Sequence, residues 1–227
     1  MHNTIAERVA SAQSALGQFK TSQTVKLIAV SKTKPSSDIE QAYAAGQRHF
    51  GENYVQELVG KAQALNHLTD IVWHFIGPIQ SNKTRDIARF ARVVHSVDRL
   101  KIAERLSAQR PADLPPLQVL VQVNISDEDS KSGVPPSDAL ALADAIAQLP
   151  NLQLVGLMAV PAPAIDGDNS HAFAQMQQLS TQLQQKYANA QELSMGMSDD
   201  WQQAVEFGAT MIRLGTAIFG ARNYAHE

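Results

Sequence analysis

The chain has 227 residues, 44% of them hydrophobic and 18% charged, which is typical of a soluble globular protein with enough chain to bury a sizeable core. Its formal net charge of −3 provides no basic footprint, so nucleic acid is not expected as a partner. The sequence contains no cysteine, which excludes disulfides, thiolate metal sites and cysteine nucleophiles.

The N-terminal segment is predicted to form an amphipathic helix, because Ile5, Val9, Ala12 and Leu16 recur at helical spacing. This segment lacks the apolar stretch of a signal peptide, and no run elsewhere in the sequence is long and apolar enough to span a membrane. We therefore expect a cytoplasmic protein that does not use a membrane as a partner.

Short apolar runs alternate with helix-patterned segments along the rest of the chain. The predicted strands are residues 25–30, 49–52, 72–77, 92–97, 118–125, 152–158, 192–197 and 211–215. The predicted helices are residues 36–46, 53–66, 81–91 and 140–149, a glutamine-rich segment ending near 188, and segments opening at 98 and 216, with Ser36, Asp38 and Asp98 as capping residues. About eight β/α units without a break in composition predict an α/β protein, a single (β/α)8 barrel domain over residues 1–227. A doubly wound open sheet is the alternative.

Lys32 follows the first predicted strand, at the end where α/β folds gather their ligand-binding groups. A lysine beside apolar walls can act as a neutral amine, and the expected product with an aldehyde cofactor is a Schiff base. The alternative is an ordinary surface lysine. None of the seven histidines forms a metal-binding spacing, so no metal is expected.

Other strand ends carry residues suited to a ligand. Ser198 can donate its hydroxyl to a phosphate, or Ser198 or Asp199 can simply cap a helix. Gly215 allows close approach of the backbone to a ligand. Arg213 lies in a predicted buried strand and needs an acceptor, either a ligand or a carboxylate in the barrel wall. Asn53 can cap its helix and bind a ligand oxygen.

Two more side chains have open roles. His74 is expected to be a satisfied residue of the barrel wall, with a proton shuttle as the alternative. Lys34 shares the strand parity of Lys32 and competes with it, although it lies a step further out before Pro35.

Seven motifs follow one another along the chain. They are A-V-S-K-T-K-P at 29–35, F-G-E-N-Y-V-Q-E at 50–57, W-H-F-I-G-P-I-Q-S-N-K at 73–83, N-I-S-D-E-D-S-K-S-G at 124–133, G-L-M-A-V-P at 156–161, L-S-M-G-M-S-D-D at 193–200 and I-R-L-G-T-A-I-F-G-A-R at 212–222. Together they resemble the pyridoxal phosphate homeostasis protein family, barrels like that of alanine racemase without its second β-domain. The resemblance implies pyridoxal 5′-phosphate (PLP) fold type III, with PLP bound as a Schiff base to Lys32. It also implies that Ser198, Gly215 and Thr216 hold the phosphate, that Arg213 faces the pyridine nitrogen and that Asn53 lies beside the cofactor.

The expected function is PLP homeostasis, in which a monomer stores the cofactor and exchanges it with PLP-dependent apo-enzymes. Arginine cannot protonate the pyridine nitrogen, and the second acid/base group of a racemase belongs to a domain that we do not expect here. A protein without robust catalytic activity is therefore favoured. The alternative is a weak amino-acid racemase or a related PLP enzyme of fold type III.

Overall fold

A computed structural model describes residues 3–126, 132–163 and 166–221 of the chain. Parts of two motifs, residues 127–131 and 222, lie outside the described residues, as do residues 164 and 165 between the predicted strand 152–158 and the glutamine-rich helix. The same holds for both ends of the domain predicted over residues 1–227.

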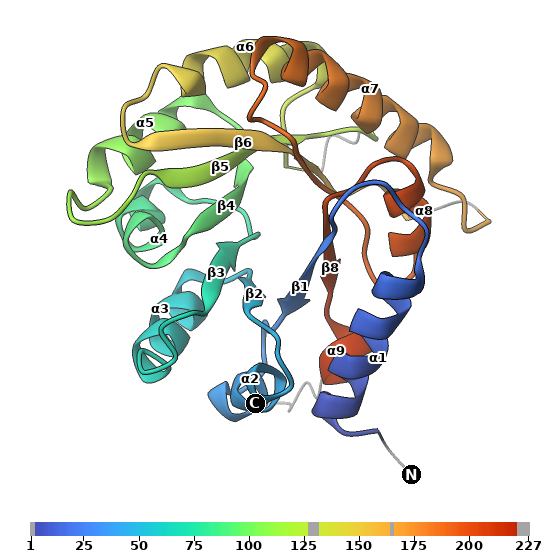
Figure 1. Cartoon of the computed structure of the whole chain (residues 1–227). Helices are drawn as coiled ribbons and strands as arrows, with labels where there is room; N and C mark the ends of the chain where they lie inside the picture. The colour runs from blue at the N-terminus through green and yellow to red at the C-terminus, as the bar shows by residue number, and fades with distance from the viewer. Residues whose placement is uncertain (1–2, 127–131, 164–165, 222–227) are drawn as a thin grey trace.

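The strands form one closed parallel barrel in which each strand pairs with its neighbours in the sequence (Figure 1). They are β1 Lys26–Val30, β2 His49–Glu52, β3 Val72–Phe75, β4 Val93–Val97, β5 Leu117–Val123, β6 Leu152–Ala159, β7 Glu192–Ser194 and β8 Met211–Leu214. The ladder from β1 to β8 closes the ring, with Lys26 opposite Met211 and Ile28 opposite Arg213. The predicted (β/α)8 barrel is therefore confirmed, and the open doubly wound sheet is wrong.

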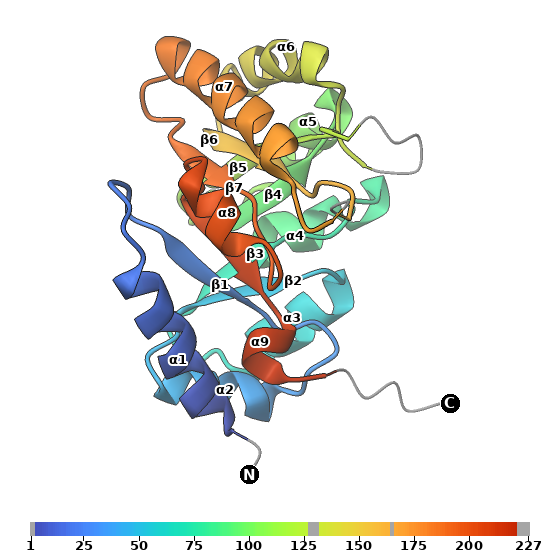
Figure 2. The ribbon, with the colours of Figure 1, turned by 90° about the vertical axis from the view of Figure 1, so that its right-hand side faces the viewer.

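The helices form a ring around the barrel. They are α1 Ile5–Gln18, α2 Ser36–Ala44, α3 Val55–Ala64, α4 Thr84–Phe90 preceded by the short 3-10 helix η1 Ser81–Lys83, α5 Leu100–Gln109, α6 Pro136–Ala147, α7 Ser170–Lys186, α8 Trp201–Glu206 and α9 Thr216–Phe219. Helix α1 packs against α2 and α9, as Figure 2 shows from the side. Among the described residues, no helix is both long and apolar enough to cross a membrane.

The main core lies between the strands and the helices. Alternate residues of β1 illustrate its origin, because Leu27 and Ala29 point outward into the large hydrophobic cluster beneath the helices. A smaller cluster of Val93, Leu120, Val155 and Met158 forms separately. Each parallel strand is thus covered on both faces, which explains the continuous apolar runs in the sequence.

Several predicted boundaries differ from the structure. Helix α2 is preceded by Pro35 and α5 by Arg99, and neither helix has a side-chain cap, so Ser36, Asp38 and Asp98 do not cap as predicted. Helix α6 begins earlier than predicted, at Pro136, because proline is well suited to the first turn of a helix.

The seventh strand is also shorter than predicted and ends at Ser194. Just beyond it, Gly196 has a φ of 96°, and a Cβ there would lie 2.6 Å from the Cβ of Ala204. The chain therefore turns at this glycine, and the following residues reach the carboxyl end of the barrel.

Candidate functional site at the carboxyl end of the barrel

The six residues predicted for the site line one cavity of about 310 Å³ at the carboxyl ends of the strands. They come from four different strands or the loops that follow them: Lys32, Asn53, Ser198, Arg213, Gly215 and Thr216. Apolar side chains, including Val30, Ile76 and Met158, complete the wall. We call this space the mouth cavity. Its size and its mixture of apolar walls with a few polar groups are those of a small-molecule site.

Lys32 reaches the mouth cavity because of the parity of β1. Val30 and Lys32 both line the cavity, whereas the intervening Ser31 is on the opposite side and is fully buried. The competing Lys34 is not among the lining residues, and its Nζ donates a hydrogen bond to the carbonyl oxygen of Ala221 at 3.0 Å.

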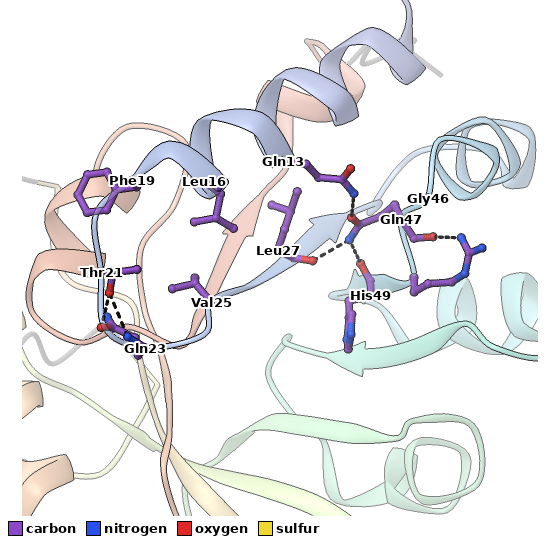
Figure 3. A pocket seen from close by; sticks show the side chains of 12 residues that line it. Gln13, Leu16, Phe19, Thr21, Gln23, Val25, Leu27, Gly46, Gln47 and His49 are labelled. Carbon is purple, nitrogen blue, oxygen red and sulfur yellow. Dashed lines mark hydrogen bonds between the residues drawn. The ribbon is translucent and has the colours of Figure 1, made fainter.

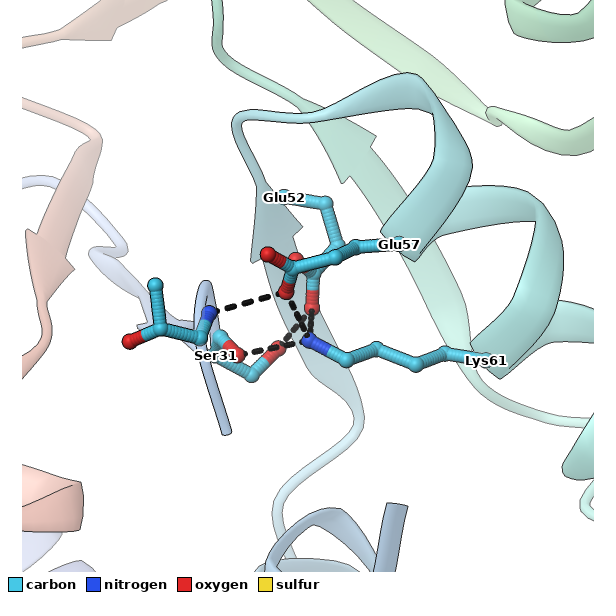
Figure 4. A network of polar contacts seen from close by, with 5 residues as sticks. Ser31, Glu52, Glu57 and Lys61 are labelled. Atoms are coloured by element: carbon cyan, nitrogen blue, oxygen red, sulfur yellow. Dashed lines mark hydrogen bonds and ion pairs between the residues drawn. The ribbon is translucent and has the colours of Figure 1, made fainter. Parts of the chain in front are cut away.

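The backbone on both sides of Lys32 is fixed by charged residues behind the loop (Figure 4). The Nζ of Lys61 donates to the carbonyl oxygen of Ser31 at 2.7 Å, and the backbone N–H of Thr33 donates to Glu57 Oε2 at 2.8 Å. Lys61 also bridges both carboxylates, at 2.8 Å to Glu52 and 2.7 Å to Glu57. Thr33 has a left-handed φ of 64°, which is unusual for a β-branched residue and is held by these contacts.

Burial raises the pKa of the Glu52 carboxyl to about 7, against the opposing effects of Lys61 and Ser31. Its Oε1 accepts from both Lys61 and the hydroxyl of Ser31. Its buried Oε2 has no hydrogen-bond partner among the described residues. The carboxyl group beneath the Lys32 loop therefore changes charge near neutral pH.

Asn53 does not cap its helix as predicted, because Tyr54 precedes α3 and that helix has no side-chain cap. Its backbone is instead held against Gly77, where a Cβ would lie 2.0 Å from the Asn53 carbonyl oxygen. The buried Oδ1 of Asn53 lacks a hydrogen-bond partner within the described part of the chain. An acceptor without a hydrogen-bond partner at the wall of a cavity suits a ligand that carries a donor.

Ser198, Gly215 and Thr216 meet where the loops after β7 and β8 lie side by side. The hydroxyl oxygens of Ser198 and Thr216 are 3.5 Å apart. Neither Ser198 nor Asp199 caps helix α8, which is preceded by Asp200. The simple capping alternative for these two residues is therefore wrong.

Arg213 is 4% exposed. Its guanidinium donates to Ser194 Oγ at 2.6 Å and to the carbonyl oxygen of Ala159 at 2.9 Å. Burial lowers its pKa to about 10, so it stays charged at neutral pH. The alternative of a salt bridge within the wall is not seen among the described residues, where Arg213 forms no ion pair.

Sequence reasoning missed two polar clusters. The first is the group around Lys61, of which only the Glu57 to Lys61 spacing of four residues was visible beforehand. The second is a line of interior histidines, His49, His74 and His95. His74 is fully buried and hydrogen-bonded to the other two, as expected of a satisfied wall residue.

The fold and the cavity define a class of protein: a (β/α)8 barrel with a lysine, a buried arginine and paired hydroxyls at its carboxyl mouth. The family model described as the alanine racemase N-terminal domain matches residues 4–223. Pyridoxal phosphate homeostasis proteins of Pseudomonas aeruginosa and Vibrio cholerae are 55% and 52% identical to this chain, covering 97% and 98% of it and 94% and 95% of their own lengths. The chain therefore belongs to the alanine racemase N-terminal domain family and, within it, to the pyridoxal phosphate homeostasis proteins.

Solved structures agree. PipY of Synechococcus elongatus with PLP bound is 41% identical to this chain, with a TM-score of 0.84. The match covers 96% of this chain and 100% of the PipY chain. The same protein without PLP is 42% identical with the same coverage and gives a TM-score of 0.87. Alanine racemase of Corynebacterium glutamicum is 16% identical, with a TM-score of 0.74, and the match covers 98% of this chain and 62% of the racemase chain. This comparison shows a similar fold.

Proposed function

We propose that this chain binds PLP in the mouth cavity and holds it reversibly on Lys32, so that the cofactor is stored and released. The observation that carries the proposal is the convergence of all six predicted residues on one cavity of about 310 Å³. The names of the relatives and the PLP-bound PipY structure support it.

The residues present fit each part of PLP. The hydroxyls of Ser198 and Thr216, with the backbone N–H groups that open α9, would bind the phosphate. The charged Arg213 would donate to the pyridine nitrogen, and the unpaired Oδ1 of Asn53 would accept from the phenolic hydroxyl. Lys32 is the one lysine among the described residues that line the cavity.

PLP supplies an aldehyde carbon. The ε-amine of Lys32 would hold the cofactor through this carbon as a Schiff base, with water as the other product. Hydrolysis would release the cofactor and restore the amine. The Lys61 cluster holds the backbone of Ser31 and Thr33, so Lys32 meets the aldehyde from a fixed loop.

Arg213 favours storage over catalysis. A guanidinium is a donor only, so a ring nitrogen in contact with it must accept and stays unprotonated. Such a ring withdraws electrons poorly, and carbanion chemistry on a bound amino acid is slow. The geometry therefore supports a carrier better than a robust enzyme.

The alternative of a weak racemase depends on a second acid/base group. Besides Lys32 and Arg213, the described lining residues include one titratable side chain, the exposed Asp199. Incubation of the PLP-loaded protein with L-alanine in D₂O tests this alternative. Fast α-proton exchange that Asp199→Asn abolishes would establish an enzyme and overturn the carrier.

The Lys32 assignment is tested by borohydride reduction of the PLP-loaded protein followed by peptide mapping. We expect the label on Lys32, its loss in Lys32→Ala and its retention in Lys34→Ala. In the wild type the Lys34 amine is hydrogen-bonded to the Ala221 carbonyl oxygen instead. A label on Lys34 would transfer the role to that residue.

The proposal extends to a cytoplasmic monomer that passes PLP to apo-enzymes. Native mass spectrometry of the loaded chain tests the monomer. Mixing the loaded chain with a PLP-dependent apo-enzyme, and following the appearance of that enzyme's activity, tests delivery.

A further inference from the structure

A continuous line of hydrogen bonds crosses the barrel interior and ends on Arg213. His49 Nδ1 lies 2.9 Å from His74 Nε2, and His74 Nδ1 lies 2.8 Å from His95 Nε2. His95 Nδ1 lies 2.8 Å from Ser194 Oγ, which accepts from Arg213 at 2.6 Å. We call the four residues before Arg213 the relay: His49, His74, His95 and Ser194.

The two ends of the relay lie in different surroundings. His74, His95 and Ser194 are fully buried, in a part of the fold that apolar side chains usually fill. His49 is half-buried and is among the residues around a separate cavity of about 600 Å³, where Figure 3 shows its backbone carbonyl facing Gln47 and its ring pointing away from Gln47. The relay therefore runs from a half-buried histidine to the arginine of the mouth cavity.

The protonation states of the relay follow from its chemistry. Burial, together with neighbouring positive charge, lowers the pKa of His74 and of His95 well below the usual value, so both rings are neutral. Each neutral ring has one N–H and one acceptor nitrogen, and the bond at one nitrogen decides the role of the other.

Arg213 sets the direction of the relay. Since its guanidinium only donates, the Ser194 oxygen is an acceptor and the Ser194 hydroxyl is free to donate to His95 Nδ1. His95 then donates from Nε2 to His74 Nδ1, and His74 donates from Nε2 to His49 Nδ1. Every dipole in the line then points its negative end towards the cation, and successive bonds polarise one another.

We propose that the relay residues are positioning residues for Arg213. They keep Ser194 an acceptor of the guanidinium, and a proton on His49 at the far end reverses the line and loosens the hold of Arg213 on the cofactor. This inference rests on the proposed function, in which Arg213 donates to the pyridine nitrogen.

The reversal takes up one proton from water and releases none. A second proton on His49 places an N–H at Nδ1, facing the N–H of His74, and two donors cannot share a bond. The facing donors are relieved when His74 and His95 both carry their proton on Nδ1 instead. Ser194 Oγ then accepts from His95 as well as from Arg213, the Ser194 hydroxyl hydrogen turns away, and the second donor on the same oxygen weakens its bond to the guanidinium.

His49 is the residue at which the reversal starts. The titratable groups facing it are Lys26 on β1, His74 on β3 and Glu192 on β7. Burial and then Lys26 lower its pKa below the usual value, against the effect of Glu192. The reversal is therefore expected on the acidic side of the ordinary histidine range.

Nitrogen NMR of ¹⁵N-histidine-labelled protein without PLP tests the direction of the relay. We expect His74 and His95 to carry their proton on Nε2 at neutral pH and to move it to Nδ1 as the pH falls. In His49→Gln the move should be absent, because glutamine accepts from His74 and does not titrate. Protons on Nδ1 at neutral pH, or the same shift in His49→Gln, would overturn the proposal.

PLP affinity as a function of pH tests the consequence. On acidification the wild type should lose affinity on the order of tenfold relative to His49→Gln, the value of a hydrogen bond to a charged group. His67→Gln, a change at an exposed histidine outside the relay, should follow the wild type. Identical profiles for wild type and His49→Gln would contradict the relay.

Ser194→Ala removes the acceptor and should weaken PLP binding at neutral pH by a similar factor. Unchanged affinity in a folded Ser194→Ala protein would also contradict the relay. Should this variant not fold, the half-buried His49→Gln still decides. A wild type that forms no borohydride-stable adduct would refute the proposed function, while the NMR experiment would still report on the relay.

Discussion

At the scale of single residues, burial brings the pKa of the Glu52 carboxyl close to neutral pH. Its pKa is about 7 in the folded chain because burial disfavours the carboxylate, against an ordinary value of 4.5. Between these values the folded state binds more protons than the unfolded state. The free energy of unfolding contributed by this residue therefore falls as the pH rises from 4.5 to 7 and is constant above that.

We expect the stability of the wild type relative to Glu52→Gln to decline across this interval, by at most about 1.4 kcal/mol per pH unit. Urea unfolding of both proteins at a series of pH values measures the difference. A difference that does not vary with pH, or that grows in favour of the wild type as the pH rises, would show that burial does not raise the pKa of this carboxyl.

At the scale of elements, Lys61 joins α3 to β2 and to Ser31, the residue that follows β1. Removing one partner from a buried ion pair leaves an uncompensated charge and commonly costs about 3–5 kcal/mol. We expect Lys61→Met to lower the free energy of unfolding by about this amount, because Glu52 loses its ion-pair partner and the Ser31 carbonyl loses a donor. Urea titrations at pH 8 measure it.

The matched control is Lys101→Met, which changes an exposed lysine on α5 and should have little effect. Adding Glu52→Gln to Lys61→Met should recover part of the loss, because the buried charge is then gone. A Lys61→Met protein as stable as the wild type would mean that the ion pair contributes little.

The turns after β7 and β8 together carry the hydroxyls proposed to bind the phosphate. Ser198→Ala combined with Thr216→Val removes two hydroxyls, each able to make a charge-assisted bond worth roughly 1.5–3 kcal/mol. The preference for PLP over pyridoxal should fall by at least tenfold on this basis. Equilibrium dialysis with both compounds measures it, with Thr181→Ala on α7 as the control. An unchanged preference would place the phosphate elsewhere.

A substitution at Gly215 tests whether this glycine is needed for folding or for ligand binding. A Cβ at this position would meet Val30 at 3.6 Å, an ordinary contact, and nothing else nearby opposes it. We therefore expect Gly215→Ala to fold with unchanged stability and to bind PLP more weakly, because the methyl group obstructs a phosphate against the backbone. Equal PLP affinity in a stable Gly215→Ala protein would contradict this role.

At the scale of the whole molecule, the mouth cavity draws on both ends of the chain, since β1 and β8 pair side by side. A ligand that bridges them stabilises the closed barrel through mass action, by about 2.7 kcal/mol at a hundredfold excess over its Kd. Thermal unfolding should therefore shift upward with PLP, less with pyridoxal, and much less in Lys32→Ala. A PLP adduct on Lys32 that leaves the unfolding temperature unchanged would show that binding is not coupled to barrel closure.

The sequence by itself determined the alternation of strands and helices, and with it the barrel, because each buried parallel strand needs a continuous apolar run. It also determined which residues follow each strand. Since all eight strand ends meet at one mouth, Lys32, Asn53, Ser198 and Arg213 could be placed in one cavity before any contact was known. Helix starts were predicted less well, because the sequence showed candidate caps at Ser36 and Asp98 that the backbone does not use.

Only the tertiary structure decided which polar groups face one another. Glu52 and Lys61 are nine residues apart, but Ser194 and His95 are separated by 99, and no local pattern connects such pairs. Strand parity places each histidine of the relay inside the barrel, yet their hydrogen bonds depend on the stagger between neighbouring strands. That stagger is set by closure of the whole ring, a property that no segment of the sequence carries alone.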